Sequence, residues 1–121
     1  MRIYLSGPIA GIDGFEKRFD RWNRYLSNFG YEVVNPCDIL PYPHAGDCPP
    51  GYVTANGHSS ACYLRTDLEA LLMCDAIFMM PGWEYSIGSR LEHSVAAHCG
   101  IKIYATNNHP PFAHRRSDAS Q

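Results

Sequence analysis

A run of five apolar residues, Ala76 to Met80, constrains the fold of this chain more than any other feature. A strand that is apolar at every position has no side suited to solvent, so both of its faces must be covered. Strands of this kind lie at the centre of parallel sheets that carry helices on each side. The run therefore predicts an α/β domain with a buried parallel strand at residues 76–80.

The segments around this run alternate between strand-like and helix-like patterns. Short β-prone runs occur at residues 2–5, 31–34 and 101–104, and apolar residues recur at helical spacing over about 13–29, 61–74 and 87–99. Gly30 and Gly100 follow the first and last of these helices, where glycine commonly ends a helix. We expect a three-layer α/β sandwich of the flavodoxin or Rossmann type, with a parallel sheet of about four or five strands.

The 121 residues suffice for one core. We expect one domain over residues 1–105, containing a long active-site loop rich in proline and glycine at 36–60, followed by a polar tail at 106–121. The net charge of −2 and the lack of an 18-residue apolar stretch argue against polymeric nucleic acid and membrane partners. With no signal-peptide pattern at its start, the protein is expected to be soluble and cytoplasmic.

Ligands of such folds bind beyond the carboxyl ends of the strands, where the strand order reverses. Three loops are expected at this edge, at residues 6–12, from 35 onward, and at 81–86. The last loop leads into Ser86-x-Gly88, with Ser86 as the predicted N-cap of a helix that carries Glu92 in its second turn. Free backbone N–H groups and the positive end of the helix dipole lie nearby, and Gly88 leaves room for a ligand.

Glu92 and Asp67 are the candidate catalytic acids. Each has a simpler interpretation: Glu92 as a solvated helix residue, and Asp67, early in the predicted helix 61–74, as a cap or helix-dipole partner. Their pairing favours function, because two carboxylates can divide nucleophile and proton-donor roles, as glycoside cleavage requires. Asp75 precedes the buried strand and should lie at the opposite end of the sheet in a structural role.

The histidines and cysteines of the chain would also suit two other kinds of chemistry. His44-x3-Cys48 and His58-x3-Cys62 repeat a pair of residue types that suit zinc, but pairs at this spacing in a helix-poor loop are weak evidence. Cysteine nucleophile chemistry is less favoured still, because none of the five cysteines lies in a strand-to-helix turn. We therefore expect no metal and no other cofactor, with the cysteines mostly as reduced thiols.

The chain resembles the nucleoside 2-deoxyribosyltransferase-like superfamily, and more narrowly its small, partly uncharacterised branch common in phages and bacteria. The resemblance covers roughly residues 2–104 except the 37–60 loop. It is carried by the segments 2–8 and 30–36, the helix holding Trp22, Asp67 with Cys74-Asp75-Ala76, and the segment from Pro81 to Glu92. Its most specific part is a succession along the chain of Asp67, the buried strand and Ser86-x-Gly88-x-x-x-Glu92.

The resemblance implies cleavage or transfer of the N-glycosidic bond of a 2′-deoxynucleoside or nucleoside 5′-monophosphate through a covalent glycosyl-glutamate intermediate. It implies Glu92 as nucleophile, Asp67 as the residue that handles protons at the leaving base, and Tyr4 as a positioning group for the sugar or for Glu92. The expected substrate-binding residues are Ser6, Gly7, Pro8, Trp83, Ser86, Gly88 and Ser89. It further implies a homodimer or higher homo-oligomer that completes each site across an interface.

Three hypotheses stay open at this point. A transferase passes the sugar to a second base, a 5′-monophosphate N-glycosidase passes it to water, and a non-catalytic module only binds the nucleotide.

Overall fold

The computed structural model describes residues 1–48 and 58–108. Its strands are β1 (Arg2–Ser6), β2 (Glu32–Val34), β3 (Ala76–Met79) and β4 (Lys102–Ala105), and its α-helices are α1 (Phe15–Asn28), α2 (Ser60–Leu72) and α3 (Ile87–His98). Two short 3-10 helices, η1 (Pro36–Asp38) and η2 (Trp83–Tyr85), follow β2 and β3. Part of the predicted loop, 49–57, and most of the predicted tail, 109–121, lie outside the described residues.

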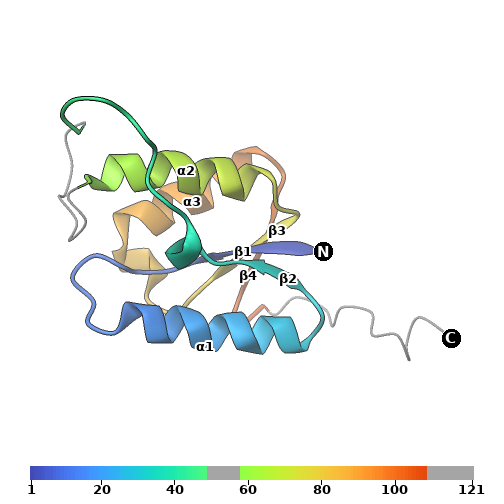
Figure 1. The fold of residues 1–121 in the computed structure, drawn as a ribbon. Helices are drawn as coiled ribbons and strands as arrows, with labels where there is room; N and C mark the ends of the chain where they lie inside the picture. Colours follow the sequence, from blue (N-terminus) through green and yellow to red (C-terminus); the bar gives the residue numbers. More distant parts are fainter. Residues whose placement is uncertain (49–57, 109–121) are drawn as a thin grey trace, which may run out of the picture.

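The four strands form a parallel sheet in the order β2-β1-β3-β4 (Figure 1). The predicted α/β fold with a parallel sheet of about four strands is confirmed. The strand order reverses between β1 and β3, and Ser6 at the end of β1 pairs with Met79 at the end of β3. The loops that follow these two strands therefore begin side by side at the carboxyl edge of the sheet.

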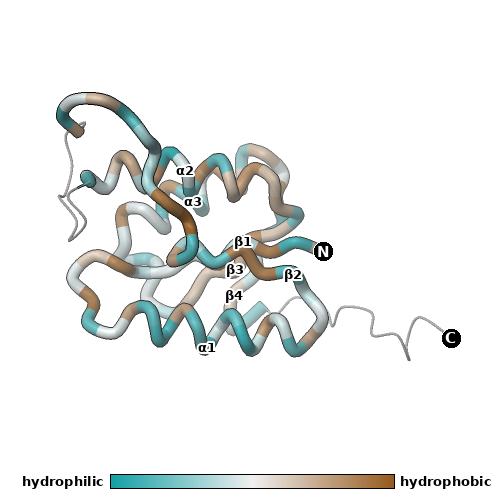
Figure 2. The backbone as a smooth tube through the Cα atoms, in the orientation of Figure 1, coloured by the Kyte–Doolittle hydropathy of each residue, from teal (hydrophilic) through white to brown (hydrophobic). Residues whose placement is uncertain are grey.

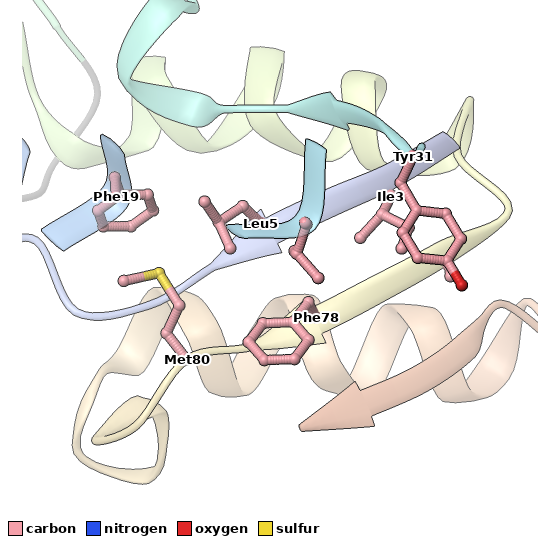
Figure 3. Packing of buried hydrophobic residues seen from close by; sticks show 8 residues of the cluster. Ile3, Leu5, Phe19, Tyr31, Phe78 and Met80 are labelled. Carbon is pink, nitrogen blue, oxygen red and sulfur yellow. The ribbon is translucent and has the colours of Figure 1, made fainter. Parts of the chain in front are cut away.

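Helices cover the sheet on both faces, with α1 on one side and α2 and α3 on the other (Figure 1). Successive side chains of a strand point to opposite faces of the sheet, so neighbouring residues belong to different core layers. Ile3 and Leu5 of β1 pack with Phe19 and Leu26 of α1, together with Phe78 of β3 (Figure 3). Burying each of these large side chains contributes roughly 1.5–3 kcal/mol.

The opposite layer contains the intervening residues of the same strands. Tyr4 of β1 and Ile77 and Met79 of β3 pack with Leu71 of α2 and Ala96 of α3. Because β1 alternates, Ser6 has the same orientation as Tyr4 and lies on the face covered by α3. The hydroxyl groups of Tyr4 and Ser6 therefore both lie beneath α3.

Most helix ends agree with the predictions. Gly30 (φ 92°) and Gly100 (φ 71°) lie one residue beyond the C-caps Phe29 and Cys99, in the left-handed region that glycine adopts readily. The hydropathy pattern in Figure 2 follows these layers, with hydrophobic colour on β1 and β2 and hydrophilic stretches along α1. Within residues 1–48 and 58–108, no helix combines the length and apolar character needed to cross a membrane.

Candidate active site

Glu92 is a buried carboxylate in the second turn of α3, with only 6% of its surface exposed. Tyr4 donates a hydrogen bond from its hydroxyl to Glu92 Oε2 at 2.6 Å, and Ser6 donates one from Oγ to Oε1 at 2.7 Å. Burial raises the pKa of Glu92, while the hydrogen bonds from Ser6 and Tyr4 oppose this by favouring the charged form. The solvated-helix interpretation of Glu92 is wrong.

Tyr4 is itself fully buried, so its hydroxyl is a fixed donor. Burial, followed by the negative charge of Glu92, holds the pKa of Tyr4 well above its ordinary value. The phenol therefore keeps its proton at neutral pH. With one donor on each carboxylate oxygen, Tyr4 and Ser6 fix the orientation of the Glu92 side chain.

Asp67 lies on α2 as a partly buried acid. Burial, and secondarily the negative charge of Glu92, raises its pKa to about 8. Its Oδ1 is buried without a hydrogen-bond partner among the residues that the structure describes. An acid in this state carries a proton at neutral pH that it can donate.

The cap or helix-dipole interpretation of Asp67 is wrong. Helix α2 begins at Ser60, so Asp67 lies beyond its first turn and close to its middle. The dipole acts chiefly within the first and last turns of a helix, where Asp67 has no part. Asp75 meets its prediction, because its Oδ2 accepts a hydrogen bond from the backbone N–H of Arg2 at 2.8 Å, before the start of β3.

The loop after β1 packs tightly on the loop after β3. A Cβ atom added to Gly7 would lie 2.8 Å from Sδ of Met80, which is closer than real side chains come. Pro8 is buried, and its Cγ faces the position that a Cβ of Gly82 would take. A larger residue in place of Gly7 would force the buried side chain of Met80 to shift, so glycine favours the close approach of these two loops.

The start of α3 faces the same edge. Ser86 is the N-cap as predicted, and its Oγ accepts a hydrogen bond from the backbone N–H of Ser89 at 3.2 Å. The N–H groups of Ile87 and Gly88, in the first turn, have no carbonyl within the helix to bind. Ser89 is 2% exposed, and its Oγ has no partner among the described residues. A Cβ added to Gly88 would have no atom within 4 Å.

Trp83 has one aromatic face occupied. Its ring stacks on the imidazole of His93, with centroids 4.6 Å apart and planes 12° from parallel. The neighbouring Tyr85 is 92% exposed. Trp83 is partly buried and also packs against the core layer that contains Tyr4, Ile77 and Met79.

Sequence reasoning missed His93 and Arg18. His93 follows Glu92 directly and could have been suspected only from that adjacency. Arg18 of α1 donates from its Nη2 to the carbonyl of Pro81 at 2.9 Å and so supports the loop after β3. No sequence pattern links residues 63 positions apart.

His44, Cys48, His58 and Cys62 lie together outside this site, and each places one possible metal-binding atom within 4.8 Å of the others.

The fold is that of a doubly wound α/β domain, as the sequence predicted. The chain belongs to the family described as "Domain of unknown function (DUF4406)", which matches residues 1–105. No curated protein matches the sequence.

Two solved structures share the fold. One is the 2-deoxyribosyltransferase of Bacillus psychrosaccharolyticus, with a TM-score of 0.62 and 18% identity, covering 98% of this chain and 90% of that one. The other is the Clostridium botulinum CMP N-glycosidase BcmB, with a TM-score of 0.55 and 22% identity, covering 87% of this chain and 70% of that one.

Proposed function

We propose that the chain cleaves or transfers the N-glycosidic bond of a 2′-deoxynucleoside or nucleoside 5′-monophosphate, with Glu92 as nucleophile and Asp67 as proton donor. The observation that carries the proposal is the buried Glu92, held by Tyr4 and Ser6 and accompanied by an acid whose pKa is about 8. Such a pair combines an oriented carboxylate with a protonated acid at neutral pH. Two solved structures with this fold are named as a 2-deoxyribosyltransferase and a CMP N-glycosidase, which act on substrates of this class.

The first chemical step forms a bond between a carboxylate oxygen of Glu92 and C1′ of the sugar. The bond from C1′ to the base nitrogen breaks, its electron pair stays on the base, and the proton of Asp67 neutralises the leaving base. The product is a glycosyl ester on Glu92. In the second step an acceptor attacks C1′, gives up a proton to the Asp67 carboxylate, breaks the ester and regenerates the Glu92 carboxylate.

The remaining candidate residues would bind the substrate. The unpaired N–H groups at the start of α3 suit the 5′ oxygen or a 5′-phosphate, and Ser89 Oγ offers a buried polar group to the ligand. Gly88 leaves the space that the sugar needs next to Glu92. In this proposal Ser6, Gly7 and Pro8 would face the sugar from the loop after β1, and the partly buried Trp83 would pack against the base.

The test is to incubate the purified chain with 2′-deoxynucleosides and nucleoside 5′-monophosphates and to follow free base by chromatography. Each substrate is tested with and without a second free base. Base release in water supports a hydrolase, whereas a new nucleoside formed only with the second base supports a transferase. A mass increase on the peptide containing Glu92 would identify the glycosyl ester.

Glu92→Gln should lower base release by at least about 10³-fold, because the neutral amide is a poor nucleophile. Glu69→Gln, at an exposed position of α2, is the matched control and should keep full activity. Unchanged turnover in Glu92→Gln would contradict the proposal. Saturable binding without base release, surviving Glu92→Gln, would instead support the non-catalytic nucleotide-binding module.

A further inference from the structure

Four side chains outside the candidate active site come from two separate segments and meet at one point. His44 and Cys48 lie in the segment after η1, His58 precedes α2, and Cys62 lies in the first turn of α2. His44 Nε2 is 3.1 Å from Cys62 Sγ and 3.5 Å from Cys48 Sγ, and Cys48 Sγ is 3.7 Å from His58 Nδ1. All four ligand atoms lie within 4.8 Å of one another.

These separations fit the edges of a tetrahedral zinc site. Zinc bonds of about 2.3 Å to sulfur and 2.0–2.1 Å to nitrogen put neighbouring ligand atoms about 3.3–3.8 Å apart at tetrahedral angles. The three sulfur–nitrogen distances, 3.1, 3.5 and 3.7 Å, scatter around this range. Movements of a few tenths of an ångström up to about 1 Å would bring the four atoms to their places around one ion.

We propose that His44, Cys48, His58 and Cys62 bind one Zn²⁺ ion. Two thiolates with two imidazoles are a donor set that zinc prefers, whereas Mg²⁺ and Ca²⁺ take oxygen ligands. Four protein ligands leave no open coordination position, so the ion has a structural role and not a catalytic one. The ion would therefore take no direct part in the proposed glycosyl chemistry of Glu92.

Hydrogen bonds next to the four residues also join the segment after η1 to the start of α2. Cys62 is fully buried, and Ser59 directs its hydroxyl at Cys62 Sγ at 3.7 Å, a contact that orients the sulfur. Beside this point the backbone N–H of Tyr42 donates to the carbonyl of Cys62 at 2.9 Å, and Thr66 Oγ1 donates to the carbonyl of Leu40 at 2.8 Å. The segment after η1 thus runs along the start of α2, and the ion would fasten the two together.

This link has a consequence for α2 as a whole. The helix carries Asp67 five residues after Cys62, so a fixed start of the helix also restrains the position of that acid. Closing a loop that spans residues 44–62 restricts the unfolded chain, and binding energy gained only in the folded state adds to stability. Zinc is therefore expected to raise the melting temperature of the protein.

A nucleophilic role for Cys62 does not fit the same geometry. The thiol is fully enclosed by protein, so an attacking sulfur could not reach a substrate. A disulfide between Cys48 and Cys62 is the competing use of the two thiols, and it predicts a protein that binds no metal.

The experiment measures zinc in the full chain purified without a histidine tag and kept under a thiol reductant. We expect about one zinc ion per chain by inductively coupled plasma mass spectrometry. After zinc is removed with a chelator, Co²⁺ should restore the site and give the intense visible bands of a tetrahedral ion together with thiolate-to-cobalt absorption in the near ultraviolet. The melting temperature should fall on chelation and recover when zinc is returned.

Matched variants separate this site from surface binding. Cys48→Ser and His44→Ala should each lower the zinc retained after gel filtration at least about tenfold. Cys99→Ser and His98→Ala, which change exposed residues at the end of α3, should retain about one zinc per chain. If a ligand variant fails to fold, the zinc content and the cobalt spectrum of the unaltered chain still test whether the metal binds.

Three results would overturn the proposal. They are an unaltered, reduced chain that binds neither zinc nor cobalt, full zinc retention by Cys48→Ser and His44→Ala, or a Cys48–Cys62 disulfide found by peptide mapping in a second sample purified without reductant. Because none of these measurements involves base release, failure of the zinc site and failure of the glycosyl chemistry are told apart.

Discussion

At the scale of single residues, Glu92 and Asp67 differ in how their charge is compensated. Glu92 accepts hydrogen bonds from Tyr4 and Ser6 on its two oxygens, whereas Asp67 Oδ1 has no partner among the described residues. Burial opposes ionisation of both acids, and the charge of Glu92 further opposes that of Asp67. We therefore expect the proton of this coupled pair to reside on Asp67 at neutral pH.

The first prediction at this scale concerns Asp67→Asn and the pH dependence of stability. The pKa of Asp67 is raised to about 8 in the folded protein, so folding favours the protonated form. This stability is present below the pKa of the unfolded chain, about 4, and is lost as pH rises toward 8. Asparagine resembles the protonated acid at every pH and has no such loss.

Thermal melts at several pH values check this expectation. Near pH 4 the variant and the unaltered protein should unfold at similar temperatures. As pH rises to 8.5, the stability of Asp67→Asn relative to the unaltered chain should increase, by at most about 1.4 kcal/mol per pH unit. A stability difference that stays constant from pH 4 to 8.5 would show that Asp67 is already ionised in the folded protein.

At the scale of elements, the site is built where two strands end and one helix begins. The loops after β1 and β3 touch through Gly7 and Met80, and α3 rises from the second of these loops. Gly7 is enclosed by atoms, while Gly88 at the start of α3 faces open space. The two glycines therefore serve different purposes, close packing at one and access for a ligand at the other.

The same substitution at these glycines should give opposite results. Gly7→Ala puts a methyl group against Met80 and should lower the free energy of unfolding by about 1–3 kcal/mol. Gly88→Ala meets no atom within 4 Å and favours the helix, so stability should stay the same or rise by up to about 1 kcal/mol. Base release should nevertheless fall in Gly88→Ala.

Urea unfolding and the chromatographic assay measure the two effects. A stable and fully active Gly88→Ala would mean that the space beside this residue is not used by the substrate. Equal stability of Gly7→Ala and the unaltered protein would mean that Met80 moves aside without cost.

At the scale of the whole molecule, the chain presents large apolar side chains around its site. Tyr85, Ile87 and Leu91 are exposed on η2 and on the start of α3, beside the elements that hold Glu92. A second copy of the chain packed here would cover this apolar surface. The homo-oligomer implied by the resemblance stays a prediction.

Sedimentation velocity tests the predicted homo-oligomer. The unaltered protein should sediment as a dimer or larger species, and the double substitution Ile87→Glu with Leu91→Glu should shift it to the monomer because charges oppose burial. Leu72→Glu, at an exposed apolar position of α2, is the control and should leave the assembly unchanged. A monomeric unaltered protein at micromolar concentration would contradict the prediction.

Much of the fold could be predicted from the sequence because its signals are local. The apolar run at 76–80, the glycines after α1 and α3 and the N-cap Ser86 depend on neighbouring residues, and the structure agrees with each. The start of α2 was predicted within one residue, at 61 against the observed Ser60, yet Asp67 was interpreted as an early residue of this helix. It lies seven residues beyond the start, and its burial against the neighbouring elements could not be read from local sequence.

The order of strands and helices, and the loops that reach the carboxyl edge, follow from the sequence alone because periodicity, capping and turn chemistry act within a few residues. The hydrogen bonds from Tyr4 and Ser6 to Glu92 join residues 88 and 86 positions apart, and four residues spread over 44–62 meet at one point; both became visible only in the folded chain. Such contacts depend on strand pairing and helix packing, which join segments that share no local pattern.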